Sequence, residues 1–445
     1  MKMSRLQRST LASSVMLAGC ELGVEQLEGG DEADEPESGD ATDELESGDG
    51  DGDGDDDGDG DAPSDECVVQ GTNIDGGSDP LDHPMPECEV ECATGWGHGA
   101  PPLAVEWTLD LEHELGAFTG YTYLARMPND ELLTLIARLD GPARLVWASA
   151  EGELLAELTQ PAIDREVLDL DVDAAGTVYA LSRDDDTHSL TALSSSGEHL
   201  WTVELGPQES YGTTIDAMDS GVLVALNAPT QLEAGQLLQV SAAGQVTPLL
   251  PIPHTQQIAL SPSGDTVAVA SNTTIRWANL SELSWTSIVG IADVHWLRAL
   301  VAIDDETVVN VGTSRSWGDG FARGYIKQVG PMGLVWEGRY DRATGWCGQM
   351  GPTDEEFADI ARLTDGSLIV AGSETGSSPD TPYIFQQPIV FHVSAGGEVL
   401  GTDRGFWEGE AVAAVAGSDG SAYALMHRFT AWNTEQHLYV RKYAF

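Results

Sequence analysis

A hairpin pattern that recurs seven times limits the folds open to this chain more than any other feature of its sequence. Each copy has a segment of alternating apolar residues, a short turn and a second such segment, as in DIARLTDGSLIVAGS at residues 359–373. A period of two is typical of β-strands, and Asp-Gly supplies the positive φ that a tight turn needs. Asp365 in this copy is therefore a turn residue and not a candidate catalytic acid. The turn positions lie 41 to 61 residues apart, at Asp130, Gly176, Gly221, Gly264, Asp305, Gly366 and Gly420.

A second hairpin follows the first in every copy except the seventh, which has only LYVRKYAF before the chain stops at Phe445. Units of about 45 residues with four short strands are typical of β-propeller blades, which bury their faces against neighbouring blades. The sequence therefore predicts an all-β fold, a seven-bladed β-propeller of four-stranded antiparallel blades over residues 103–445. The segment 103–111 has the pattern of the outer strands, so we expect it to complete the seventh blade and close the ring.

Parts of the repeats resemble known propeller families. The segment ALSSSGEHLW at residues 192–201 resembles the tryptophan-docking repeat of quinoprotein-like propellers, although Ser194 and Ser196 stand where Asp or Asn and Thr are usual. The segment IALSPSGDTVAVAS at residues 258–271 resembles the WD40-like repeat. The quinone-dependent enzymes of the first family differ from this chain in having eight blades and two adjacent cysteines. The resemblance implies that three tryptophans pack between blades, Trp107, Trp201 and Trp336.

The charge of the chain is strongly negative, with 74 Asp and Glu against 20 Lys and Arg. Between Glu21 and Glu66 there are 22 acidic residues and no basic residue. We expect residues 21–66 to be a disordered, extended tether, because like charges repel and few apolar side chains are available for burial. From Cys67 onward the formal charge is about −35, which argues against nucleic-acid binding and against direct attachment to anionic lipid.

Calcium binding is the alternative reading of the tether. Asp53, Asp55, Asp57 and Gly58 match the opening of an EF-hand-like loop, but the twelfth position is Ser64 where a bidentate Glu is expected. We therefore predict no specific cofactor, with loosely held calcium at this run as the alternative.

The first 20 residues resemble a bacterial lipoprotein signal. The segment MKMSRLQRSTLASSVMLAGC has a basic start, a short apolar run and a Leu-Ala-Gly-Cys box. The resemblance implies cleavage before Cys20 and attachment of lipid to its thiol, and hence a place in the cell envelope, at the outer membrane. The sequence does not indicate which membrane face carries the protein.

Four further cysteines lie downstream, at Cys67, Cys88, Cys92 and Cys347. In an exported protein an even number favours two disulfides, and four cysteines allow three pairings. We expect Cys347 to pair with Cys88 or Cys92 and so to fix residues 67–102, a cysteine-containing collar, to the propeller. The alternative is a zinc site formed by His83, Cys88, Cys92 and His98.

No motif for a nucleophile, a zinc protease or a phosphate-binding loop occurs, so the sequence assigns no catalytic residue. Acidic residues on inner strands face a propeller channel, and those near the second unit are Asp169, Asp171, Asp173 and Asp216. Two long excursions, residues 315–324 and 373–388, are expected on one face of adjacent blades. Their aromatic side chains form a candidate partner-binding patch, made of Trp317, Phe321, Tyr383 and Phe385.

These features predict a monomeric, membrane-anchored lipoprotein. It would present the propeller as a non-catalytic binding or scaffold module at the outer membrane, for an envelope protein or glycan partner. The alternative is an enzyme that acts in the propeller channel, a hydrolase, lactonase or quinone-dependent oxidoreductase, in the periplasm or at the cell surface.

Overall fold

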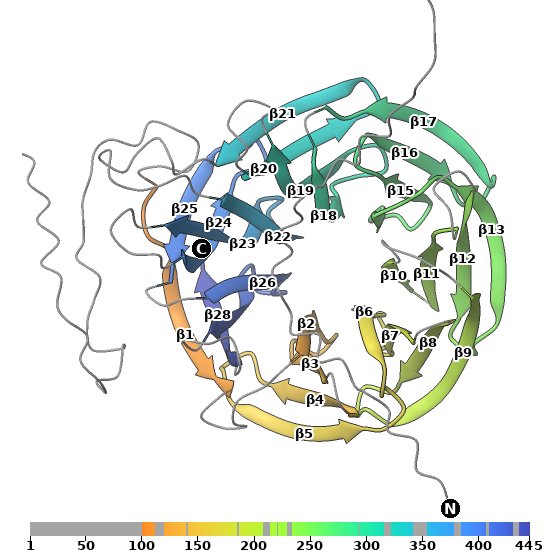
Figure 1. The fold of residues 1–445 in the computed structure, drawn as a ribbon, viewed down its shortest axis with the longest axis horizontal. Coiled ribbons are helices and arrows are strands. Elements are labelled where there is room, and N and C mark those ends of the chain that lie inside the picture. Colours follow the sequence, from red (N-terminus) through yellow and green to blue (C-terminus); the bar gives the residue numbers. More distant parts are fainter. Residues whose placement is uncertain are drawn as a thin grey trace, which may run out of the picture. The chain divides into compact units, whose positions relative to one another are not determined.

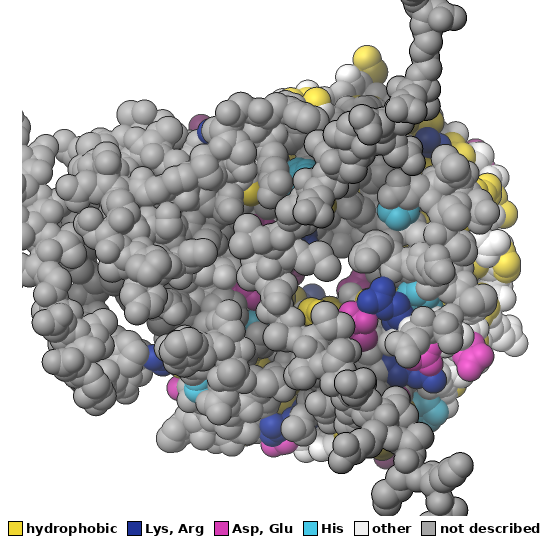
Figure 2. Space-filling view, viewed as in Figure 1, with side chains coloured by type: hydrophobic (Ala, Val, Ile, Leu, Met, Phe, Trp, Pro, Cys, Tyr) yellow, Lys and Arg dark blue, Asp and Glu magenta, His cyan; other side chains and the backbone are white. Residues whose placement is uncertain are grey.

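Seven four-stranded antiparallel sheets are arranged as blades around a central axis in the computed structural model of the chain (Figure 1). The predicted fold class is confirmed. A central opening remains in the space-filling view (Figure 2). The structure describes residues 100–111, 120–138, 141–184, 187–207, 214–219, 221–228, 234–292, 294–315, 322–340, 354–377, 384–405, 409–429 and 436–445.

In six blades the four strands follow one another along the chain from the axis outward, and in the seventh the outer strand is β1. The inner strands are β2 (Gly120–Arg126), β6 (Glu166–Val172), β10 (Thr214–Met218), β14 (Gln257–Leu260), β18 (Trp296–Ala302), β22 (Asp354–Arg362) and β26 (Gly409–Ala416). The second strands are β3 (Leu132–Arg138), β7 (Val178–Arg183), β11 (Gly221–Leu226), β15 (Thr266–Ala270), β19 (Val308–Arg315), β23 (Leu368–Ser377) and β27 (Ala422–Phe429). The third strands are β4 (Ala143–Ala148), β8 (Thr187–Leu193), β12 (Gly235–Ser241), β16 (Thr274–Asn279), β20 (Ala322–Gly330), β24 (Ile384–Val393) and β28 (Gln436–Ala444). The outer strands are β5 (Leu154–Gln160), β9 (His199–Pro207), β13 (Val246–Ile252), β17 (Ser284–Gly290), β21 (Gly333–Tyr340), β25 (Val399–Arg404) and β1 (Ala104–Asp110).

The seventh blade is built from both ends of the propeller. β1 pairs antiparallel with β28, and its register runs from Ala104 opposite Ala444 to Asp110 opposite Tyr439. We number the blades 1 to 7 from β2 to β26, so β1 is the outer strand of blade 7.

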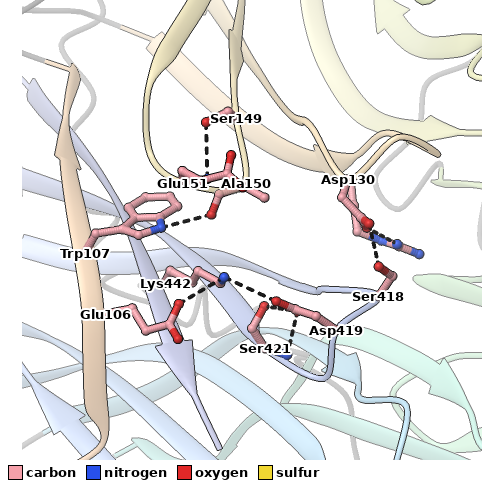
Figure 3. A network of polar contacts seen from close by, with 11 residues as sticks. Glu106, Trp107, Asp130, Ser149, Ala150, Glu151, Ser418, Asp419, Ser421 and Lys442 are labelled. Carbon is pink, nitrogen blue, oxygen red and sulfur yellow. Dashed lines mark hydrogen bonds and ion pairs between the residues drawn. The ribbon is translucent and has the colours of Figure 1, made fainter.

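A polar network surrounds this closure (Figure 3). The ammonium group of Lys442 on β28 lies 2.9 Å from Glu106 on β1 and 3.3 Å from Asp419, in the turn before β27. Hydrogen bonds from Ser421, together with the Lys442 charge, lower the pKa of Asp419 to about 2. The closing strand is thus held by charged side chains as well as by backbone hydrogen bonds.

The core of the propeller lies between the blades. Seven apolar clusters are formed by the described residues, and each joins one blade to the next. The cluster between blades 2 and 3, for example, packs Tyr179 and Leu181 against Val222, and none of these side chains is exposed. Because each blade buries both faces in this way, the ring is stabilised as a unit.

Tryptophans complete three of these interfaces. The indole N–H groups of Trp107, Trp201 and Trp336 donate to turn carbonyls of the following blade, at 3.0, 2.8 and 3.2 Å. The acceptors are the carbonyl oxygens of Ala150, Ala242 and Ala395. The predicted packing role of these tryptophans is confirmed.

Several sequence predictions concern segments outside the described residues. These are the lipid-attachment residue Cys20, the tether 21–66, most of the collar 67–102, and the four downstream cysteines Cys67, Cys88, Cys92 and Cys347. Within the part of the chain that the structure describes, no helix is long and apolar enough to cross a membrane.

Candidate functional site: the channel carboxylates

Four aspartates on inner strands are candidates for chemistry in the channel. Asp169 and Asp171 are two residues apart on β6, which places them on the same face of the strand. Asp216 lies on β10 of the next blade, and Asp359 lies on β22 of blade 6. All four side chains are half-buried.

Asp169 connects two blades. Its Oδ2 atom accepts hydrogen bonds from the backbone N–H of Ile215, at 2.9 Å, and from the hydroxyl of Thr214, at 2.7 Å. Its Oδ1 atom accepts the backbone N–H of Leu170 at 2.8 Å. One carboxylate therefore satisfies N–H groups on β6 and on β10, both of which are edge strands facing the channel.

The other three aspartates repeat this arrangement. Asp171 accepts the N–H of Ala217 in the next blade at 2.6 Å. Asp216 accepts the N–H of Leu260 at 2.6 Å, and Asp359 accepts the N–H of Ala414 at 2.8 Å. The donor is always on the inner strand of the following blade, so these carboxylates hold neighbouring inner strands together.

Tyr123 also connects two blades, but as a hydrogen-bond donor and not as an acceptor. Its hydroxyl donates to the carbonyl oxygen of Val167 at 2.6 Å, which connects blade 1 to blade 2. The connections between inner strands therefore use both acceptor and donor side chains, according to which backbone group of the next strand is unpaired.

Burial raises the pKa of all four carboxyl groups. The pKa of Asp171 rises to about 6 and that of Asp359 to about 7, while the pKa of Asp169 is raised and that of Asp216 is raised well above its ordinary value. The cause is that the surrounding inner strands exclude most bulk water, although each side chain keeps some accessible surface. Backbone hydrogen bonds oppose the rise in each case, and the charges of other aspartates add to it for Asp171, Asp216 and Asp359.

Asp359 was not among the sequence candidates, although the sequence carries a signal for it. Asp359 and Asp169 each lie seven residues before the turn glycine of their own blade, Gly366 and Gly176. Aligning the repeats on those glycines would have identified the two aspartates as equivalent.

Asp173 differs from the prediction that it lies on an inner strand. It follows the last residue of β6 and is buried in the turn, where its Oδ1 atom accepts the N–H groups of Ala175 and Thr177 at 2.9 and 2.8 Å. Its Oδ2 atom accepts the hydroxyl of Tyr179 at 3.0 Å. Asp173 is therefore a turn-stabilising residue. Asp365 has the turn role expected for it, since it accepts the N–H and the hydroxyl of Ser367.

Charged groups near the starts of the inner strands are paired with one another. Glu166 lies 2.7 Å from Arg183, Glu356 pairs with Arg298, and Glu410 lies 3.5 Å from His427. Figure 2 shows basic and acidic side chains next to each other beside the central opening. The described residues contain no group of three or more His, Cys, Asp or Glu side chains arranged to hold a metal ion.

The arrangement can perform two kinds of chemistry. The aspartates accept backbone N–H groups and so connect neighbouring inner strands. A carboxyl group with a pKa near 7 can also exchange protons at neutral pH, which is the property of a general acid or base. In Asp169, Asp171 and Asp359 the Oδ2 atom accepts an N–H of the next blade and the Oδ1 atom accepts the N–H of the following residue on the same strand. Both oxygens are therefore occupied by backbone groups, which favours the first role.

Replacing Asp359 by asparagine should change the dependence of stability on pH. Because the folded pKa of about 7 lies above the ordinary value of 3.8, the free energy contributed by this group is fully present below about pH 4 and is lost as the pH rises through 7. Between about pH 5 and about pH 8, the free energy of unfolding should therefore fall more in wild type than in Asp359→Asn.

Asp365→Asn is the matched control for that measurement. Hydrogen bonds from Ser367 lower the pKa of Asp365, so this group stays ionised over the same range. The difference in free energy of unfolding between wild type and Asp365→Asn should therefore not change with pH. Parallel pH profiles for wild type and Asp359→Asn would contradict a raised pKa at Asp359.

A second candidate surface lies at blades 5 and 6, whose second and third strands form long hairpins. The strands of blade 6 have nine, ten, ten and six residues, against four, five, six and seven in blade 4. The pairing of β23 with β24 continues to Ser377 opposite Ile384, and that of β19 with β20 continues to Arg315 opposite Ala322. The described parts of the predicted excursions, residues 315, 322–324, 373–377 and 384–388, therefore belong to regular hairpins.

A buried polar network connects blades 5 and 6 beside these hairpins. The hydroxyl of Tyr340 donates to Glu374 at 2.8 Å, and the guanidinium group of Arg404 donates to the same hydroxyl at 2.8 Å. Glu374 and Tyr340 are almost fully buried. Of the predicted patch residues, Phe385 lies on β24, whereas Trp317, Phe321 and Tyr383 fall outside the described residues.

Comparison with known proteins finds structural likenesses at low sequence identity. No protein family matches the chain, and no curated protein matches it. Among solved structures, a chain of hydrazine synthase from Kuenenia stuttgartiensis is 11% identical, with 68% of this chain and 91% of that chain covered and a TM-score of 0.48. A Bacteroides caccae protein of unknown function is 16% identical, with coverage of 50% and 82% and a TM-score of 0.36. The seven-bladed propeller is established by the strand order and register of this chain itself.

Proposed function

We propose that this protein is a lipid-anchored envelope protein whose propeller serves as a non-catalytic binding or scaffold module. The observation that supports this most directly is the use of the channel aspartates as connections between blades. Three of the four acidic residues that the sequence offered for chemistry, Asp169, Asp171 and Asp216, accept backbone N–H groups of the next blade. These side chains contribute to the rigidity of the platform.

The binding surface proposed for the partner is the face of blades 5 and 6 at which their second and third strands are connected. Long paired strands with a buried Tyr340–Glu374–Arg404 network form a rigid base there. The aromatic residues in and beside those hairpins, Trp317, Phe321, Tyr383 and Phe385, are of the types that most often dominate binding energy in interfaces. The proposed partner is an envelope protein or glycan.

The lipid anchor is proposed from the sequence around Cys20. Replacing Cys20 by alanine should move the full-length protein from the membrane fraction to the soluble fraction, because a thioether-linked diacylglycerol is the proposed membrane attachment. The measurement is fractionation of cells followed by immunoblotting. Cys347→Ala is a matched control that removes a thiol and leaves the signal intact. Retention of Cys20→Ala in the membrane fraction at the level of wild type would contradict the proposal.

A pull-down from detergent-solubilised envelope tests the binding function. The lipidated full-length protein should retain a stoichiometric partner. The double variant Trp317→Ala, Tyr383→Ala should recover at least about tenfold less of that partner, since truncating central aromatic anchors typically costs 2 kcal/mol or more. Met332→Ala and Ile288→Ala remove apolar side chains that are exposed outside the patch, and they should retain the partner. Equal recovery with the double variant would show that the patch is not the binding surface.

The alternative function, an enzyme acting in the channel, is favoured by one observation. Asp359 combines a pKa of about 7 with residual exposure to the channel. An enzyme of this kind would lose activity in Asp359→Asn while keeping its partner in the pull-down. A binding module would instead keep its partner in Asp359→Asn and lose it in the double variant Trp317→Ala, Tyr383→Ala.

A further inference from the structure

In three blades a tryptophan on the outer strand covers a turn of the following blade. Trp107 on β1, Trp201 on β9 and Trp336 on β21 each lie next to a bulge in the pairing with the third strand. Each indole lies over a glycine in the turn between the third and outer strands of the following blade, the three glycines being Gly152, Gly244 and Gly397. A Cβ atom on any of these glycines would come within 2.7 to 3.0 Å of the indole.

The corresponding positions of three other blades have a small residue, and in blade 4 this residue is Ser287. In blade 6 the residue beside the bulge is Gly401, and the side chain of Leu103 fills the space over it. In blade 1 the residue beside the bulge is Ala156, which pairs with Trp147 as Trp201 pairs with Ala192. A methyl group thus stands in blade 1 where three other blades have an indole.

Trp147 covers the turn of blade 2 only in part. The tip of its ring and Leu158 lie where a Cβ on Gly197 would come within 2.8 Å. The indole N–H of Trp147 is buried and has no hydrogen-bond partner among the described residues, in contrast to those of Trp107, Trp201 and Trp336. The cover supplied by β4 therefore does not reproduce the docking seen in the other blades.

A groove of about 630 Å³ lies at this incomplete interface. Trp147 and Ala156 line it from blade 1, and the turn residues Ala175, Gly176 and Ser195 line it from blade 2. β5 beside it has five consecutive exposed residues, among them Leu155 and Leu158, 48% and 38% exposed. Exposed leucines next to an open groove are typical of a binding surface.

The charge of the groove is one-sided. Among the described residues that line it, the charged ones are Glu131 and Glu157, and none is Lys, Arg or His. Glu157 is paired with Arg144, so Glu131 is the carboxylate available to a ligand at the rim. The folded part of the chain adds a formal charge of about −35, which attracts cationic ligands and repels anionic ones.

We propose that the groove between blades 1 and 2 binds a peptide segment of a partner protein that presents an aromatic side chain two residues from a Lys or Arg. The aromatic side chain lies against Ala156 and Trp147, in the space that an indole of the chain itself fills in blades 2, 5 and 7. The cationic group of the peptide pairs with Glu131. The amino-terminal segment 67–99 of this chain is a poorer occupant because it contains six acidic residues and no basic residue.

This surface is separate from the one proposed at blades 5 and 6. The groove is lined by turns that join first to second strands and third to outer strands, Met127 to Glu131 and Ser195 to Ser196 among them. The patch at blades 5 and 6 lies at connections between second and third strands, which are at the opposite ends of antiparallel strands. Either proposal can therefore fail without the other.

Titration of the full-length protein with a fluorescein-labelled peptide Lys-Leu-Trp-Leu-Lys, followed by fluorescence anisotropy, tests the inference. Wild type should bind this peptide saturably, more tightly than Glu-Leu-Trp-Leu-Glu and more tightly than Lys-Leu-Ala-Leu-Lys. Ala156→Trp should weaken binding by about tenfold or more, because the new indole occupies the groove. Glu131→Gln should weaken binding of the cationic peptide several-fold and reduce its dependence on salt.

Ile288→Trp, the same type of substitution on the exposed outer strand β17, is the matched control and should bind as wild type does. Thermal unfolding of each variant establishes that it is folded, and Glu131→Gln tests the site even where Ala156→Trp does not fold. Absence of saturable binding by wild type would overturn the inference. Unchanged affinity in folded Ala156→Trp, unchanged affinity in Glu131→Gln, or equal affinity for the acidic peptide would overturn it as well.

Discussion

Deleting residues 103–111 should abolish the single cooperative unfolding transition of the propeller. The deletion removes β1, so that β28 becomes an unpaired outer strand with its backbone groups exposed. It also removes Trp107, Leu109 and Leu111 from the apolar cluster between blades 7 and 1, where Leu111 is 1% exposed. Loss of three such side chains costs on the order of 5 kcal/mol, which is comparable to the whole stability of a typical domain.

Deletion of residues 51–59 is the matched control, since it removes the same number of residues from the acidic tether. Calorimetry of the two deletion variants should give a broad, low-enthalpy transition for the first and a wild-type transition for the second. An unchanged melting profile for the protein without residues 103–111 would show that β1 is dispensable for ring closure.

Replacing Gly397 by alanine should destabilise the propeller by about 3 kcal/mol, and replacing Gly366 by alanine by about 1 kcal/mol. Both glycines have a positive φ, 89° and 88°, so both substitutions carry the same backbone strain. The difference is what the new methyl group meets. At Gly397 it comes within 2.7 Å of the Trp336 ring, whereas no atom lies within 4 Å of the new Cβ at Gly366.

The comparison isolates the contribution of tryptophan docking. Trp336 must move away from the turn of blade 6 in Gly397→Ala, and its hydrogen bond to the Ala395 carbonyl is then lost. Chemical denaturation of both variants gives the two free energies of unfolding. Equal losses would mean that the indole adapts without cost and that docking contributes little to the cohesion of the ring.

The sequence predicted the repeating part of this fold well because each repeat carries its own local signal. Alternating apolar residues specify strands, and glycines such as Gly176 and Gly420, both with positive φ, specify the turns between them. The pairing of β1 with β28 could also be predicted, since the seventh unit lacks an outer segment and a matching segment precedes the first unit.

The functional details were harder to predict because they depend on contacts between blades. Asp169 accepts the N–H of Ile215, 46 residues away, and nothing in the local sequence of either residue indicates this bond. The prediction that Asp173 faces the channel was wrong for a related reason. A strand boundary one residue earlier moves its side chain into the turn, where Tyr179 is its partner.

The groove between blades 1 and 2 shows the same dependence on neighbouring blades. Ala156 alone, as a residue on an exposed strand, does not indicate a binding surface. Comparing its register with those of Trp107, Trp201 and Trp336 shows that it occupies the position of a docking tryptophan. Differences between structurally equivalent positions of a repeat protein can therefore indicate binding surfaces that the consensus pattern hides.

The position of the closing strand has a mechanical consequence. Before β1, the chain makes two backbone hydrogen bonds with Thr402 of blade 6, through the Pro101 carbonyl and the Leu103 N–H, each 2.9 Å long. Tension applied through the amino-terminal residues therefore reaches the propeller at these two bonds and then at β1, before any other strand. Pulling on this end strains the ring at its closure, whereas pulling on a partner bound at blades 1 and 2 or at blades 5 and 6 distributes force across continuous sheets.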